Sequence, residues 1–461
     1  MRIALALAPT FPKAYPLIGL ASLAAALKRE GHEVAVFDFS ASRQFPYSNS
    51  EAVWHDPEFA ARYDMENPGF FPGMAREISD WKPELSGFSC WLSNWPAALK
   101  IAALLKAGNP SLFTVFGGPE AGFSPERFLA AKQTDAVIIG EGEGALTALA
   151  RAVADGKANF QAPPGVRLRR GKQILDGGPA KEVEDLDTLP MPDFGSFRRG
   201  DYLIPDMLPI SFSRGCLRRC AFCNTATSWQ KFRHRGARSL FEEFKRDAQE
   251  YGARYLQVTS PSLNARPDVL DELCGLLLAE GLRLGWGGPA FFSDSLTPAF
   301  LKKLVSAGLG TMDFGLESGA PNVLRLMGKG FSAETAERNI RDCFDAGIKS
   351  YLNILIGFPG ETDEDVELTK SFLKRNKKWI AHVGEPSECI IAQDNLLMRH
   401  PERFGVNPDV KNKWATWETS DGRNTHEVRQ RRINEFRRWA AEEGLAVNGP
   451  VFRPEEKAKN I

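Results

Sequence analysis

Three cysteines lie within eight residues of one another, in the stretch CLRRCAFC that runs from Cys216 to Cys223. The whole chain of 461 residues has only seven cysteines, so this stretch concentrates nearly half of its thiols. Thiolates at such close quarters usually hold a metal. A structural zinc ion takes four ligands, and each cluster of a ferredoxin-like electron carrier does the same.

The stretch offers no fourth thiol, because the next cysteine, Cys274, falls in an expected helix, and the nearest histidine is His234. A zinc site of three cysteines and one histidine stays open as an alternative. The favoured interpretation is a four-iron cluster with three thiolate ligands, which leaves one iron free for an exogenous ligand. Basic residues around the cysteines would favour the reduced form of such a cluster. They are Arg214, Arg218, Arg219, Lys231, Arg233, Arg235 and Arg238.

The cysteines directly follow the apolar segment LPISFSR, which opens a series of alternating strand and helix signals. Further strands are expected at 253–260, 282–288, 311–318, 349–359 and 387–393. Helices are expected near 239–250, 267–280, 297–307, 333–346 and 363–376. Five βα units and a sixth strand predict a partial (β/α)6 barrel of the TIM-like kind over residues 206–399, with its reactive groups at the carboxyl ends of the strands.

Residues 1–156 also alternate between strand and helix signals, which predicts an α/β domain with a doubly wound, Rossmann-like parallel sheet. We expect a long loop at 40–73, a linker with a small hairpin at 157–205, and a carboxy-terminal extension with one late helix at 400–461. No Gly-x-Gly-x-x-Gly pattern follows the first strand, so dinucleotide binding is not expected. Glycine-rich turns instead follow later strands, at 116–122 and 140–144, and leave room for a large flat ligand.

The pattern Cys216-x-x-x-Cys220-x-x-Cys223 after a strand, with Phe222 before the last cysteine, resembles the signature of the radical S-adenosylmethionine (radical SAM) superfamily. The resemblance implies that the three cysteines are metal ligands and catalytic, and hold a [4Fe-4S] cluster whose open iron binds S-adenosylmethionine. One electron, supplied by an external donor such as a flavodoxin or a ferredoxin, would then cleave this cofactor to a 5′-deoxyadenosyl radical.

Other segments resemble the cofactor contacts of this superfamily, and Phe222 is expected among them. Where the second strand often ends in Gly-Gly-Glu, this chain has VTSPSLN, so Ser260, Ser262 or Asn264 would contact the amino group of S-adenosylmethionine. Glu317, in FGLESG, would meet the ribose or the carboxylate; its alternative role is a charge at the start of the next helix. In NILIGFPGET, the glycines would let the backbone approach the adenine. These glycines are Gly357 and Gly360.

The first domain resembles the cobalamin-binding domain that precedes the barrel in one large subfamily of these enzymes. The resemblance implies that Gly117, Gly118, Gly140 and Gly142 line the cobalamin. The domain lacks an Asp-x-His-x-x-Gly loop, and its only early histidine is His32, so cobalamin would bind without a histidine lower ligand. A domain that kept the fold and lost the cofactor is the alternative.

The resemblance favours methylation of an unactivated carbon or phosphorus centre through methylcobalamin. A radical rearrangement or cyclisation without methyl transfer, a methylthiotransferase and a non-catalytic iron–sulfur or zinc protein are the alternatives. A methylthiotransferase would need three cysteines in the first domain, where only Cys90 occurs.

A small-molecule substrate is expected, because Lys plus Arg equals Asp plus Glu at 58 each and gives no net charge that indicates nucleic acid. No apolar stretch is long enough for a membrane span. The isolated cysteines favour a reducing cytoplasm.

Overall fold

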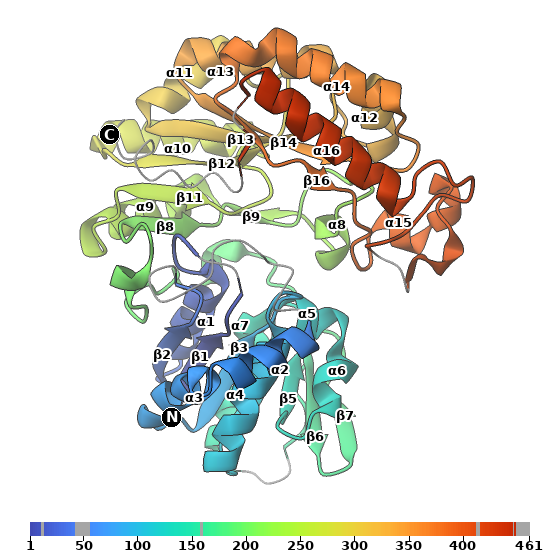
Figure 1. Cartoon of the computed structure of the whole chain (residues 1–461). Coiled ribbons are helices and arrows are strands. Elements are labelled where there is room, and N and C mark those ends of the chain that lie inside the picture. The colour runs from blue at the N-terminus through green and yellow to red at the C-terminus, as the bar shows by residue number, and fades with distance from the viewer. Residues whose placement is uncertain (11–12, 42–55, 157–159, 412–414, 446, 449–461) are drawn as a thin grey trace. The chain divides into compact units, whose positions relative to one another are not determined.

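The computed structural model describes residues 1–10, 13–41, 56–156, 160–411, 415–445 and 447–448 (Figure 1). The chain divides into two compact units, Met1–Pro209 and Ile210–Ile461. Segment 157–205 therefore belongs to the first unit, and the carboxy-terminal extension belongs to the second. None of the helices in the described part of the chain combines the length and the apolar composition that crossing a membrane requires.

The first unit is built on one seven-stranded sheet with the order β2-β1-β3-β4-β5-β6-β7. Its parallel strands are β1 (Arg2–Leu7), β2 (Glu33–Asp38), β3 (Leu85–Ser89), β4 (Phe113–Gly117) and β5 (Ala136–Ile138). The predicted hairpin is present as β6 (Val166–Arg170) and β7 (Gln173–Asp176), which extend the sheet in antiparallel fashion.

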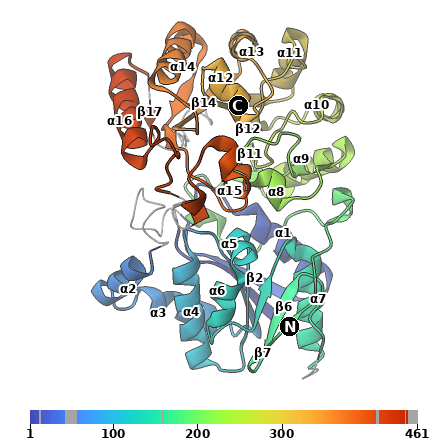
Figure 2. The same cartoon turned by 90° about the vertical axis from the view of Figure 1, so that its right-hand side faces the viewer.

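The helices of the first unit cover both faces of this sheet. Residues 3–7 of β1 and residue 8, which follows the strand, are therefore all buried. Helices α1 and α7 pack together, as do α3 and α4 (Figure 2). The helices are α1 (Ile18–Arg29), α2 (Pro57–Glu66), α3 (Phe70–Asp80), α4 (Trp95–Gly108), α5 (Pro119–Phe123), α6 (Pro125–Ala130) and α7 (Gly142–Ala154). The predicted doubly wound α/β fold is confirmed.

The expectation of a long loop over residues 40–73 is wrong in its second half, where α2 and the start of α3 lie. Tyr63 and Phe71 are 6% and 0% exposed and join the core on the α4 side of the sheet. The burial of these two side chains stabilises helices that the polar composition of this segment does not predict. Residues 42–55 lie outside the described residues.

The second unit is built on a sheet with the order β17-β15-β14-β13-β12-β11-β8, and β16 pairs with β14 beside this path. The strands are β8 (Met207–Ile210), β11 (Tyr255–Val258), β12 (Gly285–Ala290), β13 (Leu309–Glu317), β14 (Lys349–Ile356), β15 (His382–Gly384), β16 (Ser387–Glu388) and β17 (Val447–Asn448). Within the residues described, β8 and β17 are the two ends of this sheet, so it stays an open, partial barrel.

The helices of the second unit follow the predicted βα series closely. They are α8 (Thr225–Ser228), α9 (Ala237–Glu250), α10 (Pro267–Glu280), α11 (Pro298–Ser306), α12 (Pro321–Met327), α13 (Ala333–Ala346), α14 (Asp363–Asn376), α15 (Leu396–Arg399) and α16 (His426–Glu442). Short 3-10 helices occur in the first unit at Leu186–Thr188 and Arg199–Asp201, and in the second unit at Lys377–Trp379, Pro401–Phe404 and Pro408–Lys411.

The prediction of the sixth strand is wrong in position. The sheet continues through β15 at His382–Gly384, and only Ser387–Glu388 of the expected 387–393 segment pairs with a strand. The apolar residues Cys389 and Ile391 are buried all the same, in a cluster with Trp417 of the extension. Their apolar pattern therefore reports burial against the extension and not strand pairing.

Candidate cofactor site

The three cysteines lie in one loop that a two-stranded ribbon closes at its base. Strand β9 (Ser213–Arg214) pairs in antiparallel fashion with β10 (Arg233–His234). Gly215 turns the chain into the loop with a φ of +79°, and a Cβ atom there would lie 2.7 Å from the carbonyl oxygen of Lys231. Only glycine fits this turn, and its close approach to the ribbon fixes the backbone immediately before Cys216.

The loop is also held from two helices at its far side. The Ala221 N–H donates to the carbonyl oxygen of Met327, at the end of α12, over 2.9 Å. The Asn395 amide, at the start of α15, donates to the carbonyl oxygen of Phe222 over 2.9 Å. The cysteine loop is therefore fixed by main-chain contacts at residues 221–222, between Cys220 and Cys223.

The sulfur atoms of the loop have backbone donors close by. The Arg218 N–H lies 3.4 Å from the Cys216 sulfur, and the Thr225 N–H lies 3.4 Å from the Cys223 sulfur. All three side chains are partly exposed, and none is in a disulfide. Donors of this kind stabilise a thiolate, which is the form that binds iron.

Lys329 supplies a positive charge to the same group. Burial raises the pKa of the Cys216 thiol and of the Cys220 thiol, and the Lys329 ammonium lowers both. The charge of Cys223 in turn raises the pKa of Cys216 and of Cys220, so the three thiols influence one another. No motif distinguished Lys329 in the sequence, because its place depends on where α12 ends.

Glu317 pairs with this lysine at the carboxyl end of β13. Its carboxylate lies 3.3 Å from Lys329 Nζ, and the two side chains are 13% and 10% exposed. Glu317 has a φ of +65°, and the register between β13 and β14 shifts between Gly315 and Glu317. This irregularity directs Glu317 out of the normal strand alternation, which is typical of functional positions. The ion pair links Glu317 to the charge beside the cysteines.

The expected adenine segment lies at the end of β14 and shares a core with the cysteine loop. Phe358 is fully buried in a cluster with Ala221, and Phe222 packs against this cluster. Gly357 and Gly360 have φ values of +87° and +88°, and Gly360 is exposed. The structure thus brings the 357–361 loop and the cysteine loop onto one apolar cluster.

The polar atoms of Ser260 and Asn264 are already bonded within the unit. The Ser260 hydroxyl accepts hydrogen bonds from the N–H groups of Phe212 and Ser213, over 2.6 and 3.0 Å. The Asn264 amide donates to the carbonyl oxygen of Phe291 over 2.9 Å and accepts from its N–H over 3.1 Å. These contacts explain why both residues are buried, and their contact with S-adenosylmethionine stays a prediction.

In the first unit, Gly117 and Gly118 lie where β4 ends. Gly118 has a φ of +90°, and a Cβ atom there would lie 2.8 Å from the carbonyl oxygen of Cys90. A Cβ atom at Gly117 would meet only Ile138, at 3.8 Å. Close packing therefore requires glycine at 118, and Gly117 is the position with free space.

Gly140 and Gly142 lie where the chain passes from β5 to α7. A Cβ atom at Gly140 would lie 2.8 Å from that of Ala180, and one at Gly142 would lie 2.9 Å from Leu23 Cδ2. Packing inside the unit thus accounts for both glycines. Because β4 and β5 are parallel, the two glycine turns meet at the same edge of the sheet, where α/β folds bind ligands.

The thiol donors are of the kind that binds an iron–sulfur cluster. In the described part of the chain, no three Cys, His, Asp or Glu side chains lie close enough to hold one metal ion. An iron–sulfur cube spaces its protein ligands more widely, because each thiolate binds a different iron. Three thiols on one loop with backbone donors and a lysine beside them are chemically suited to such a cluster.

Comparison with known families now defines the class. Residues 210–373 match the model of the radical SAM superfamily, and residues 5–150 match that of the B12 binding domain. The chain therefore belongs to the radical S-adenosylmethionine enzymes that carry a cobalamin-binding domain. It is an enzyme whose cofactors are a [4Fe-4S] cluster, S-adenosylmethionine and cobalamin.

The chain is also similar to three individual proteins. It is 25% identical over 365 residues to an uncharacterized methyltransferase of Pyrococcus horikoshii, covering 78% of this chain and 73% of that protein. It is 26% identical to the anaerobic magnesium-protoporphyrin IX monomethyl ester cyclase of Rubrivivax gelatinosus, over 64% of this chain and 55% of the cyclase. The radical S-adenosylmethionine methyltransferase TsrM of Kitasatospora setae, solved with cobalamin and a [4Fe-4S] cluster, has the same fold. Its TM-score is 0.67 at 18% identity, over 87% of this chain and 78% of TsrM.

Proposed function

We propose that this protein is a cobalamin-dependent methyltransferase that methylates an unactivated carbon or phosphorus centre of a small molecule. The observation that carries the proposal is the three-cysteine loop with Lys329 and Glu317 beside it, in a chain whose other unit belongs to the B12-binding family. When bound, the cluster and S-adenosylmethionine supply a 5′-deoxyadenosyl radical for hydrogen abstraction, and cobalamin supplies the methyl group.

The residues of the chain would divide this work as follows. Cys216, Cys220 and Cys223 would hold the cluster as thiolates, with the Lys329 ammonium favouring the ionised form of Cys216 and Cys220. Glu317 would accept a hydrogen bond from a ribose hydroxyl of S-adenosylmethionine while it keeps Lys329 in place. An external donor of the flavodoxin or ferredoxin class would deliver the electron at the exposed side of the cysteine loop.

Reconstitution and product analysis test the proposal. The protein, purified from cobalamin-supplied cells and reconstituted anaerobically with iron and sulfide, should show iron–sulfide and cobalamin absorption. After reduction it should convert S-adenosylmethionine to 5′-deoxyadenosine and, with the right substrate, to S-adenosylhomocysteine beside a methylated product. Cys216→Ala should bind neither iron nor sulfide, whereas Cys274→Ala, in a helix away from the loop, should bind both. Failure to cleave S-adenosylmethionine would refute the enzyme assignment.

A radical cyclisation without methyl transfer is the second proposal, because the cyclase of Rubrivivax gelatinosus is 26% identical to this chain over 306 residues, beside 25% over 365 residues for the methyltransferase. The two activities differ in their by-products. A cyclisation would give 5′-deoxyadenosine without S-adenosylhomocysteine. A methylthiotransferase has less support, because Cys90 is fully buried and burial raises its pKa well above the usual thiol range.

A further inference from the structure

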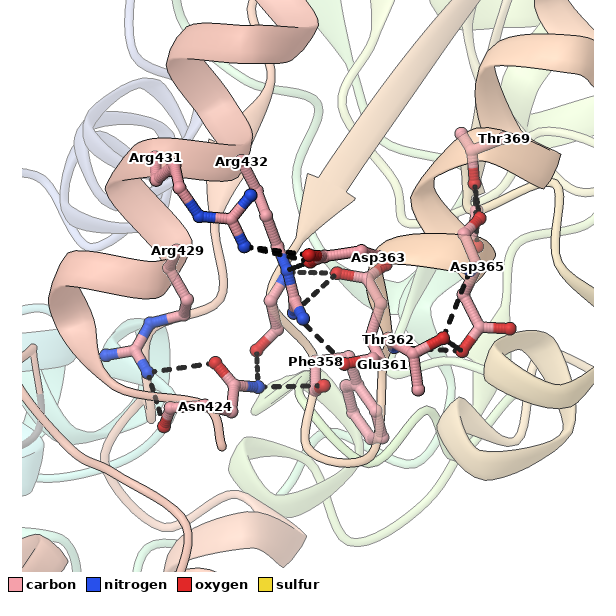
Figure 3. A network of polar contacts seen from close by, with 12 residues as sticks. Phe358, Glu361, Thr362, Asp363, Asp365, Thr369, Asn424, Arg429, Arg431 and Arg432 are labelled. Carbon is pink, nitrogen blue, oxygen red and sulfur yellow. Dashed lines mark hydrogen bonds and ion pairs between the residues drawn. The ribbon is translucent and has the colours of Figure 1, made fainter. Parts of the chain in front are cut away.

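The loop at the end of β14, residues 357–361, is enclosed by the carboxy-terminal extension. Figure 3 shows Asn424 directed at Phe358 and Arg432 directed at Glu361 and Asp363, while the Arg429 guanidinium is directed at Asn424. The bonded residues of the two segments are 66 to 71 positions apart in the sequence.

Asn424 binds the first part of this loop. It is 2% exposed, and its amide nitrogen donates to the carbonyl oxygens of Gly357 and Phe358 over 3.0 and 3.2 Å. Asn424 is itself fixed, because its N–H donates to the Thr419 hydroxyl over 3.0 Å. One side chain therefore orients two successive peptide groups of the loop.

Arg429, which lies on α16, packs against Gly357 in the same part of the loop. Its side chain is fully buried, and its stem leaves so little space that a Cβ atom at Gly357 would lie 2.3 Å from Arg429 Cγ and Cδ. Its guanidinium lies 4.0 Å from the ring centroid of Trp417 and donates to Glu388 over 2.7 Å. Glu388 pairs with Ile356 at the end of β14, so Arg429 ties the extension to the start of the loop.

Arg432 and Glu361 close the loop at its other end. Arg432 donates to the carbonyl oxygen of Glu361 over 3.0 Å and to the Asp363 carboxylate over 2.7 Å. The Glu361 side chain turns back and accepts from the Gly357 N–H over 2.5 Å. The backbone of the loop is thus held at Gly357, Phe358 and Glu361, while Gly360 remains exposed.

Simple packing does not account for this arrangement. Removing a guanidinium from water costs several kcal/mol, and apolar side chains of similar volume would stabilise a core at least as well. Directional bonds to loop carbonyls give what apolar contacts cannot, which is one orientation of the peptide groups. The loop in turn places Phe358 on the cluster that supports the cysteine loop.

We propose that the carboxy-terminal extension, through Asn424 and Arg429, positions the 357–361 loop for the adenosine part of S-adenosylmethionine. Asn424 and Arg429 are positioning residues, because they act on the cofactor through the loop. The inference rests on the proposed function and on the expectation that this loop, where Gly360 is exposed, approaches the adenine. It predicts that the extension controls the affinity for S-adenosylmethionine without touching this cofactor.

The test compares Asn424→Ala and Arg429→Lys with two control variants on α16. Arg437→Gln removes an exposed ion pair with Glu385. Phe436→Leu replaces a fully buried aromatic side chain, two helical turns beyond Arg429, with a smaller one. Phe436→Leu serves as the control for loss of stability. Arg429→Lys keeps the stem and charge of Arg429 and removes its planar fork. Each protein is reconstituted anaerobically with iron and sulfide, and binding of S-adenosylmethionine is measured by equilibrium dialysis.

Two measurements decide the outcome. Asn424→Ala should weaken S-adenosylmethionine binding about fivefold, because it removes two hydrogen bonds from the loop, and Arg429→Lys should weaken it less. Hydrogen exchange of the cofactor-free protein should become about tenfold faster at the amides of 357–361 in Asn424→Ala. Arg437→Gln and Phe436→Leu should bind the cofactor within about twofold of the wild type.

Wild-type affinity in Asn424→Ala, or an equal loss in Phe436→Leu, would overturn this inference alone. A reconstituted wild-type protein that does not bind S-adenosylmethionine would overturn the proposed function together with it.

Discussion

Glu361→Gln tests whether a buried carboxyl group in the adenine loop is protonated at neutral pH. The Glu361 side chain is 2% exposed, and Arg432 Nη1 is 4.0 Å away. Burial raises the pKa of Glu361 to about 8, although the Gly357 N–H and the Arg432 guanidinium oppose this rise. We therefore expect the neutral acid to be the native form up to about pH 8, and a glutamine to replace it closely.

The direction of the pH dependence follows from the proton count. In the unfolded chain Glu361 ionises near its ordinary pKa of 4.5, so between pH 4.5 and 8 the folded state holds one more proton. The free energy of unfolding must then fall as pH rises through this window, by about 1.4 kcal/mol per pH unit. Glu361→Gln lacks this contribution, so from pH 5.5 to pH 7.5 its stability should rise by about 3 kcal/mol relative to the wild type.

Urea unfolding of the cofactor-free wild type and variant across this pH range measures the difference, in which other titrating groups cancel. Infrared spectroscopy gives a direct check, because a protonated carboxyl group has a carbonyl stretch distinct from that of a carboxylate. This band should be weaker in Glu361→Gln at pH 6.5. Parallel pH profiles and identical infrared bands would show that the carboxylate is ionised in the fold and would refute the reasoning.

Three further variants test other contacts. Lys329→Met should lower the free energy of unfolding by about 1–3 kcal/mol, because it leaves Glu317 largely buried without its ion pair. A double-mutant cycle with Glu317→Gln should give a coupling energy of about 1 kcal/mol, and zero coupling would contradict the ion pair. Gly118→Ala should lower the thermal midpoint of the first unit, since position 118 has a φ of +90° and no space for Cβ, whereas Gly122→Ala, with open space, should leave it unchanged in the same calorimetric scan. Thr362→Ala should cost about 1 kcal/mol in urea unfolding by removing the capping box of α14, and Thr362→Ser should restore most of it.

Much of the second unit could be predicted from its pattern because local signals and burial agree there. Helices α10, α13 and α14 begin and end where the periodicity and the capping residues indicate. The proline at the start of α10 and the glycine after α13 are local signals, and they act wherever the helix packs. The cysteine loop is likewise a local feature, since its spacing is written in eight consecutive residues.

The site around that loop could not be predicted to the same extent. Ser260 and Asn264 were expected at the cofactor, and the structure uses their polar atoms to join neighbouring loops. The glycine at 357 was expected to make room for a ligand, and the structure fills the space beside it with Arg429. A glycine or a small polar residue is compatible with several partners, and only the packed neighbours decide which partner it has.

By itself, the sequence determined the class of chemistry, the two α/β units and the three candidate ligands, because spacing and periodicity depend on neighbours along the chain. Only the tertiary structure decided that Lys329 lies beside the thiols and that the extension encloses the 357–361 loop. Both contacts join residues that are distant in sequence. Their energies depend on burial and on distances across packed elements, and no local pattern encodes those quantities.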